Sequence, residues 1–310
     1  MSDAPQDTRE SEDANAPSPR SEFLFKLTVA LIAIATVVGV SGYLYLRYAT
    51  LGPMAEQTIE GSMPAGPKLR VTNDTGLLRV VGADTDEVTF RGTKIIQTST
   101  VQSSEDALEA IQLITSHDQG GGLLQLIYPD GGPALQKTDI EIRAPRDTQL
   151  LIEGKNANIW IENITAAVQI KSEDAPNITV TGCTGKIDIG ARDAEIFAYV
   201  PAEAESASLT ARNGVVRVVL YGEDPAPFTS NVEDGTFTLT IDEEAYPGIR
   251  IEGEGMILDT TAAKDVPADQ IPRPALLRAK DPQAEPGAQL SIGKAQLTLE
   301  TGKPKAPSTP

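Results

Sequence analysis

The chain has 310 residues, with 44 acidic and 26 basic side chains and a formal net charge of −18. This acidity argues against a nucleic-acid partner, because phosphate backbones would be repelled. A single cysteine (Cys183) excludes an internal disulfide framework, and a single histidine (His117) argues against a histidine-based triad or a multi-histidine metal site.

The first 22 residues are rich in Asp, Glu, Ser, Pro and Ala and show no apolar periodicity. Such a segment cannot bury enough apolar surface to offset the entropy lost on ordering. We predict a disordered acidic tail over residues 1–22.

The stretch from Leu27 to Leu46 contains no charged residue. As a helix it would span ~30 Å, the hydrocarbon thickness of a bilayer. Aromatic and basic residues flank both ends. We therefore predict a transmembrane helix over residues 23–48. The alternatives are a cleaved signal peptide and a buried core helix, but the run exceeds a typical signal-peptide core and is apolar on every face.

The basic residues around this run predict its orientation. Arg9, Arg20 and Lys26 precede it, whereas Arg47 alone follows closely. The positive-inside rule then places the N-terminus in the cytoplasm and the chain after residue 50 outside it. This is the layout of a single-pass signal-anchor protein of a bacterial membrane.

Residues 49–67 are rich in Gly and Pro and predict a linker. A mainly β domain is expected over residues 68–300, followed by a loose tail over 301–310. Within the domain, apolar residues at helical spacing predict a short helix near 104–116. We expect this helix to cover an open end of the β structure.

Four apolar–x–apolar triplets follow one another, starting 9, 10 and 9 residues apart and separated by turn formers. They are residues 159–161, 168–170, 178–180 and 187–189. Ile and Val at these positions can stack on their equivalents every ~4.8 Å. The spacing predicts a parallel β-solenoid or β-roll with two strands per layer, and an antiparallel β-sandwich is the alternative. Whether residues 249–299 join the same coil stays open.

The residues do not predict an active site. Acidic residues are frequent in the repeats, but a solvated acidic surface accounts for them, and the glycine-rich calcium nonapeptide is absent. We therefore expect no catalytic residue, no metal and no cofactor. Trp160 lies between Ile159 and Ile161 and would face away from them, so it is a candidate contact residue. The alternative is that it packs beneath a loop.

Two motifs resemble those of a bacterial putative-adhesin family of β-strand repeats. One is V-x-N-x-x-G-x-x-x-V-x-G, from Val71 to Gly82, and the other is a strand that ends in proline, from Ile140 to Pro145. Asn156 and Asp174 stand at turns where that family usually has glycine. The resemblance covers about residues 68–242. It implies a β-roll domain of unknown function on the outer side of the membrane and supplies no catalytic residues.

Together these features predict a membrane-anchored, non-enzymatic binding, adhesin-like or scaffold module. Its expected partners are an envelope protein, a polysaccharide or further copies of itself. One alternative is an envelope enzyme acting on polysaccharide, which needs two carboxylates about 5–10 Å apart beside a groove. Another is a regulatory or sensing subunit of an envelope complex.

Overall fold

The computed structural model describes residues 27–29, 32–42, 54–98, 101–130, 135–222, 226–241, 249–253, 256–260, 275–277 and 288–301. The chain divides into two compact units, Met1–Gly52 and Pro53–Pro310. The predicted tails, 1–22 and almost all of 301–310, lie outside the described residues.

In the first unit, residues 27–29 and 32–42 are helical. Apolar side chains of this helix are exposed, with Ile32, Ile34, Val37 and Val38 each 60–64% accessible. The Thr36 hydroxyl donates to the Ile32 carbonyl at 2.8 Å, so the helix satisfies this polar group internally. Within the described residues, no helix has both the length and the apolarity needed to cross a membrane. The rest of the predicted 23–48 span lies outside those residues.

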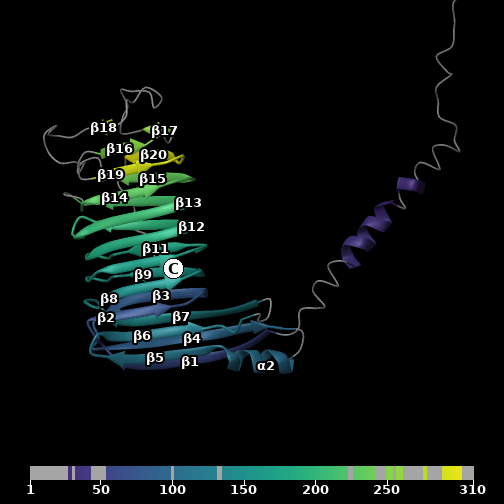
Figure 1. Cartoon of the computed structure of the whole chain (residues 1–310). Helices are drawn as coiled ribbons and strands as arrows, with labels where there is room; N and C mark the ends of the chain where they lie inside the picture. Colours follow the sequence, from purple (N-terminus) through teal and green to yellow (C-terminus); the bar gives the residue numbers. More distant parts are fainter. Residues whose placement is uncertain are drawn as a thin grey trace, which may run out of the picture. The chain divides into compact units, whose positions relative to one another are not determined.

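The second unit is mainly β, with 20 described strands in one sheet and one described helix (Figure 1). The elements, in chain order, are β1 (Met54–Pro64), β2 (Lys68–Thr72), β3 (Thr75–Ala83), β4 (Glu87–Gln97), α2 (Val101–Ala110), β5 (Gln112–Asp118), β6 (Gly121–Ile127), β7 (Leu135–Pro145), β8 (Gln149–Gly154), β9 (Asn156–Glu162), β10 (Val168–Ser172), β11 (Ile178–Thr181), β12 (Lys186–Pro201), β13 (Ser206–Tyr221), β14 (Phe228–Val232), β15 (Thr236–Ile241), β16 (Ile249–Gly253), β17 (Met256–Thr260), β18 (Ala275–Leu277), β19 (Ala288–Ile292) and β20 (Gln296–Thr301).

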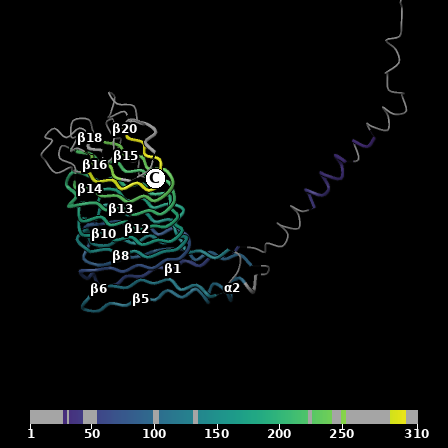
Figure 2. The backbone as a smooth tube through the Cα atoms, turned by 45° about the horizontal axis from the view of Figure 1, so that its top comes forward, coloured from purple at the N-terminus to yellow at the C-terminus, as the bar shows by residue number. Residues whose placement is uncertain are grey.

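Two parallel ladders run through this sheet. The first has the order β6, β2, β8, β10, β12, β13, β14, β19, β16. The second has the order β7, β3, β9, β11, β12, β13, β15, β20, β17. Each layer of the stack gives one strand, or one half of the long strands β12 and β13, to each ladder. The views in Figures 1 and 2 show the layers piled along one direction.

The sheet is mixed, because antiparallel strands continue it at both ends of the stack. β4 and then β1 extend the second ladder beyond β7, while β5 pairs with β6 and β18 with β16. The sequence-based expectation of a wholly parallel structure is therefore wrong at the ends. The antiparallel-sandwich alternative does not describe the parallel ladders between them.

The layers do not follow chain order. The first layer in the sequence, β2 with β3, lies between β6/β7 and β8/β9. The last layer, β19 with β20, lies between β14/β15 and β16/β17. Strands between residues 249 and 301 therefore belong to the same sheet, which answers the question that the sequence leaves open.

The core consists of side-chain columns that cross the layers in register. One column consists of residues that are register partners from strand to strand across the second ladder, and each is at most 2% exposed. They are Leu78, Ile140, Ile159, Ile178, Ile196, Val216, Phe237 and Leu297. All four predicted triplets are strand segments, and their flanking apolar residues point inward. Stacked aliphatic side chains exclude water along the whole interior, which is where the domain gains its hydrophobic stabilisation.

The V-x-N-x-x-G motif forms the corner between β2 and β3. Asn73 is fully buried, donates from Nδ2 to the Thr138 carbonyl at 3.1 Å and accepts from the Tyr128 hydroxyl at 2.7 Å. Gly76 has a φ of +99°, and a Cβ there would lie 2.3 Å from the Thr138 carbonyl oxygen. The motif therefore serves packing: it fixes the first layer of the chain against Tyr128, which follows β6, and against Thr138 of β7.

Two predicted elements are corrected by the structure. The predicted linker 49–67 contains β1, because Met54–Pro64 pair with β4 along the whole strand. The Phe90 ring packs over Gly61 and leaves no room for a side chain there. The predicted helix 104–116 ends at Ala110, and residues 112–118 form β5, in which His117 lies opposite Gly122. Isolated helical spacing is outweighed here by pairing along β6. Helix α2 does contact β1 and β4, and its Leu108 is buried.

Candidate functional site

A column of outward-facing side chains runs across the second ladder at the β1 end. Glu60 of β1 is in register with Arg91 of β4, which is in register with Glu141 of β7. Glu141 pairs in turn with Arg79 of β3, and Arg79 with Trp160 of β9. Strand alternation places all five on the outer face, because their immediate neighbours in each strand point inward.

A groove of about 960 Å³ lies over the outer face of β1, β4, β7 and β3. Arg91 of β4 is exposed and is one of the residues that line this groove. Hydroxyl-bearing residues occupy the adjacent outward positions on β4 and β1 and pair with one another across the strands: Thr89 with Ser62 and Thr93 with Thr58. The groove is therefore lined mainly by guanidinium, carboxylate and hydroxyl groups, and this surface is called the Arg91 groove below.

The arginines of the Arg91 groove differ in how many ion pairs they form with the described residues. Glu141 accepts from Arg143 at 3.1 Å and lies 3.6 Å from Arg79. Arg79 also pairs at 3.1 Å with Glu162, whose side chain is buried. Among the described residues, Arg91 forms no ion pair, although its register neighbours are both glutamates. One guanidinium group thus remains available to a ligand.

Trp160 faces outward, as its position between Ile159 and Ile161 predicts, and is half-buried. It lies one layer from Arg79 and one layer from Thr179, so it borders the Arg91 groove without lining it. Its indole Nε1 is buried and finds no hydrogen-bond partner in the part of the chain that the structure describes. That Trp160 contacts a ligand stays a prediction.

The sequence offered a weak signal for the remaining groove residues. Thr89, Arg91 and Thr93 alternate with the inward residues of a strand, so a polar outer face was predictable. Their meeting with Glu141 and Arg79 depends on the pairing of β4 with β7 and of β7 with β3. Those pairings join segments about 50 to 60 residues apart, which no local pattern specifies.

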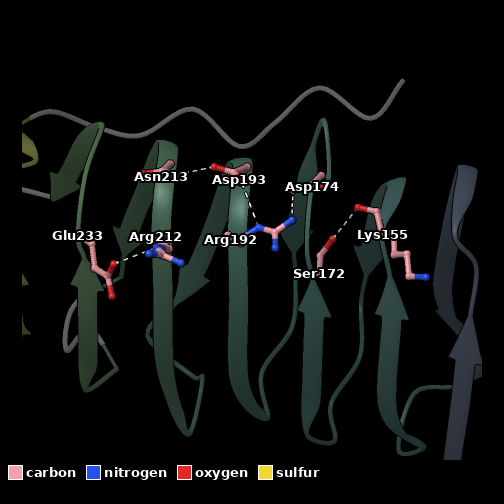
Figure 3. Close-up of polar contacts among 8 residues, drawn as sticks. All are labelled: Lys155, Ser172, Asp174, Arg192, Asp193, Arg212, Asn213 and Glu233. Carbon is pink, nitrogen blue, oxygen red and sulfur yellow. Dashed lines mark hydrogen bonds and ion pairs between the residues drawn. The ribbon is translucent and has the colours of Figure 1, made fainter.

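A second polar cluster follows a corner of the stack, where successive layers carry charged side chains of both signs (Figure 3). Arg192 donates to Asp174 at 2.8 Å, and Asn213 donates to Asp193 at 2.6 Å. The hydrogen bond to Asp174 raises the pKa of Arg192, and that from Asn213 lowers the pKa of Asp193. Arg212 lies 3.5 Å from Glu233 in the same series. These groups satisfy one another between layers, so the corner is a structural feature.

Outside the Arg91 groove, the described residues offer neither a reactive cysteine nor a metal-binding cluster. Burial raises the pKa of Cys183 to about 11, which keeps its thiol protonated and unreactive at neutral pH. Within the described ranges, no group of three or more His, Cys, Asp or Glu side chains could hold a metal ion.

No protein-family model and no curated protein matches this chain. Among solved structures, similarity extends to a putative adhesin from Bacteroides fragilis, with 13% identity, a TM-score of 0.40, and coverage of 81% of this chain and 99% of that one. A putative cell adhesion protein from Clostridium sporogenes has 10% identity and a TM-score of 0.37, covering 81% and 100%. A putative lipid binding protein from Parabacteroides distasonis has 11% identity and a TM-score of 0.26, covering 80% and 97%. Values of this size assign neither a family nor an activity.

Proposed function

We propose that this protein is a single-pass, membrane-anchored binding module without enzymatic activity. Its N-terminus is cytoplasmic, and its layered domain, a β-solenoid with antiparallel ends, is displayed outside the bacterial cytoplasm. The domain binds an envelope component in the Arg91 groove. The observation that carries the proposal is the exposed guanidinium of Arg91, which lines a groove of about 960 Å³ and forms no ion pair with the residues that the structure describes.

Support for the anchor comes from the uncharged run of residues 27–46 and from the exposed apolar side chains of the helical residues 32–42. Contiguous apolar side chains left in water are unfavourable and favour a lipid or protein environment. Basic residues before the run support the cytoplasmic position of the N-terminus.

Support for binding, as opposed to catalysis, comes from the groove carboxylates. A polysaccharide-cleaving enzyme needs two carboxylates free to act on the same bond. Three carboxylates line the groove: Glu60, Asp139 and Glu141. Arg79 and Arg143 engage Glu141, and Lys137 and the Leu77 N–H engage Asp139, so Glu60 has no second free carboxylate beside it among the groove residues. The groove strands are also paired on both sides from β4 to β3, so the surface is a rigid platform.

The experiment compares the full-length protein with two charge-reversal variants, Arg91→Glu in the groove and Lys186→Glu as a matched control. Lys186 is exposed at the start of β12, away from the groove. Each is crosslinked in native membranes, and the captured components are identified by mass spectrometry. We expect Arg91→Glu alone to lose specific components. Identical capture by both variants, or recovery of the protein outside the membrane fraction, would contradict the proposal.

A further inference from the structure

We propose that the open edge of β1 binds an extended segment of a partner protein as an additional strand, and that this segment places a basic residue opposite Glu60. The site is separate from the guanidinium of Arg91, so the inference goes beyond the function proposed above. Three features lead to it: the length and regularity of the edge, the charges of the strands behind it, and the residue types along β1.

The edge of β1 is the longest open strand edge in the described part of the chain. All eleven residues of β1 pair with β4, and no described strand pairs with its other side. The other described strands that pair on one side only, β5, β17 and β18, have seven, five and three residues. β1 lies at one end of the stack (Figure 1). Backbone N–H and C=O groups alternate between the two edges of a strand, so about half of those of β1 face away from β4.

This edge lacks several of the features that usually prevent strand addition. Its pairing with β4 runs without a register shift, so no bulge turns the edge away, and its one proline, Pro64, is the last residue of the strand. Lysine, the residue most used to protect exposed edges, is absent from β1. The edge can therefore accept a strand whose side chains match its own.

The outward-facing column behind this edge alternates in charge. Its residues, in register from strand to strand, are Glu60, Arg91, Glu141 and Arg79. Glu60 stands at the open edge, is exposed and forms no ion pair with a described residue. Opposite charges that face each other on neighbouring strands stabilise a sheet, and like charges destabilise it. An added strand continues the alternation when it places lysine or arginine opposite Glu60.

The residues around Glu60 define the rest of the matching segment. Thr58 is in register with Thr93, and Ser62 with Thr89, so hydroxyl groups pair across the strands on both sides of Glu60. Between them, the partly buried Ile59 packs against the core. The segment that fits is hydroxyl–apolar–basic–apolar–hydroxyl. This pattern reads the same in both directions, so it fits a parallel or an antiparallel strand.

Charge separates this occupant from a second copy of the chain. β1 contains Glu56 and Glu60 and no basic residue. Helix α2, which contacts β1, contains Glu105, Asp106 and Glu109 and no basic residue. Two copies paired through β1 would bring acidic residues together from both sides without a counter-charge, which destabilises the pairing. A basic segment of a different protein meets complementary charge.

The test measures the fluorescence anisotropy of labelled peptides mixed with the full-length protein in detergent micelles. The probe is Ser-Val-Thr-Val-Arg-Val-Thr-Val-Ser. One matched peptide has glutamate in place of arginine, and another carries a methyl group on every interior backbone nitrogen. We expect the glutamate peptide to bind at least about tenfold more weakly, because attraction to Glu60 is replaced by repulsion. The methylated peptide cannot donate backbone hydrogen bonds and should not bind.

Variants of the protein test the register. Glu60→Lys should weaken binding of the arginine peptide by about tenfold and strengthen binding of the glutamate peptide by a similar factor. The matched control is Glu205→Lys, which reverses an exposed charge just before β13 and should change neither affinity by more than about twofold.

Hydrogen exchange locates the contact. The N–H groups of β1 that face the open edge have no described strand partner, so they should exchange rapidly in the free protein and be protected by the arginine peptide. β15 pairs with β13 and β20 on its two sides and should show no change.

Several outcomes would overturn the inference. No binding of the arginine peptide would remove the site, and equal binding of the glutamate or the methylated peptide would remove the basic residue or the added strand. Binding without protection of β1 would place the contact elsewhere. Dimers of the unmodified protein that dissociate in Glu60→Lys would assign the edge to a second copy. If no peptide binds while Arg91→Glu still loses components in native membranes, this inference falls and the proposed function stands.

Discussion

Asn73 should be among the polar residues whose loss destabilises the domain most. Its side chain is fully buried at the corner between β2 and β3 and connects two segments that lie far apart in sequence. Nδ2 donates to the Thr138 carbonyl at 3.1 Å, and Oδ1 accepts from the Tyr128 hydroxyl at 2.7 Å. Oδ1 also accepts from the Thr75 N–H at 3.4 Å. The variant Asn73→Ala removes all three contacts and leaves the Thr138 carbonyl without this donor.

The expected magnitude follows from these contacts. Each intramolecular hydrogen bond contributes about 1 kcal/mol net, and a buried polar group left without its partner costs about 1–3 kcal/mol. Tyr128 keeps a second acceptor, the Thr75 carbonyl at 3.0 Å, so its hydroxyl is not left unpaired. Asn73→Ala should therefore lower the free energy of unfolding by about 3 kcal/mol. Tyr128→Phe, which removes one of the three contacts of the Asn73 side chain, should lower it by about 1 kcal/mol.

The measurement is urea-induced unfolding of the full-length protein in detergent, followed by fluorescence. Trp160 is the only tryptophan in the sequence, and its strand, β9, pairs directly with β3. The control is Asn158→Ala, which removes an exposed asparagine from the same strand as the probe. A loss below about 0.5 kcal/mol for Asn73→Ala would refute the argument, and so would equal losses for Asn73→Ala and the control Asn158→Ala. Additive effects of Asn73→Ala and Tyr128→Phe would show that the two side chains are not coupled.

Three further predictions concern single sites. Gly76→Ala should lower the free energy of unfolding by at least about 2 kcal/mol, because Gly76 has a positive φ and the Thr138 carbonyl lies against it. The control Gly190→Ala, whose new Cβ would meet nothing closer than 3.9 Å, should be nearly neutral. Similar values for the two variants would refute the steric argument. Ser230→Ala should raise stability by about 1 kcal/mol, because the buried Ser230 hydroxyl has no partner among the described residues; a loss would show that the hydroxyl is satisfied. Burial raises the pKa of Cys183 from 9.0 to about 11, so its contribution to stability is complete below pH 9 and is lost as the pH rises towards 11. Cys183→Ala should flatten the pH dependence of urea unfolding in that interval, and an unchanged slope would contradict this.

Most of the repetitive part of the fold could be predicted from the sequence. In each triplet, such as 159–161, the periodicity of two and the Ile or Val residues give both the strand and its inward face. The ends could not be predicted in this way. β1 carries Gly61 and Pro64, typical of linkers, and forms a strand because the open edge of β4 and the Phe90 ring are available to it. Tertiary pairing outweighs local propensity at such edges.

The candidate site was predictable only in part. Trp160 could be placed on the outer face from the alternation of β9 alone. Arg91, by contrast, gains its significance from Glu60 and Glu141, which reach it through two antiparallel pairings. Alternation indicates that these residues are exposed, but it does not indicate which strand lies beside which.

The order of the layers has a mechanical consequence. In a simple stack, tension on a chain end peels the outermost strand away, breaking its hydrogen bonds one after another. Here the last strands of the chain, β19 and β20, are hydrogen-bonded to neighbours on both sides. At the other end, once β1 has been detached, the next strands, β2 and β3, are also hydrogen-bonded on both sides. A pull on either end then has to slide a strand pair out from between two neighbours, so that many bonds are loaded in shear at once. A protein tethered at one end and attached to a partner elsewhere would resist extension through this interleaving alone.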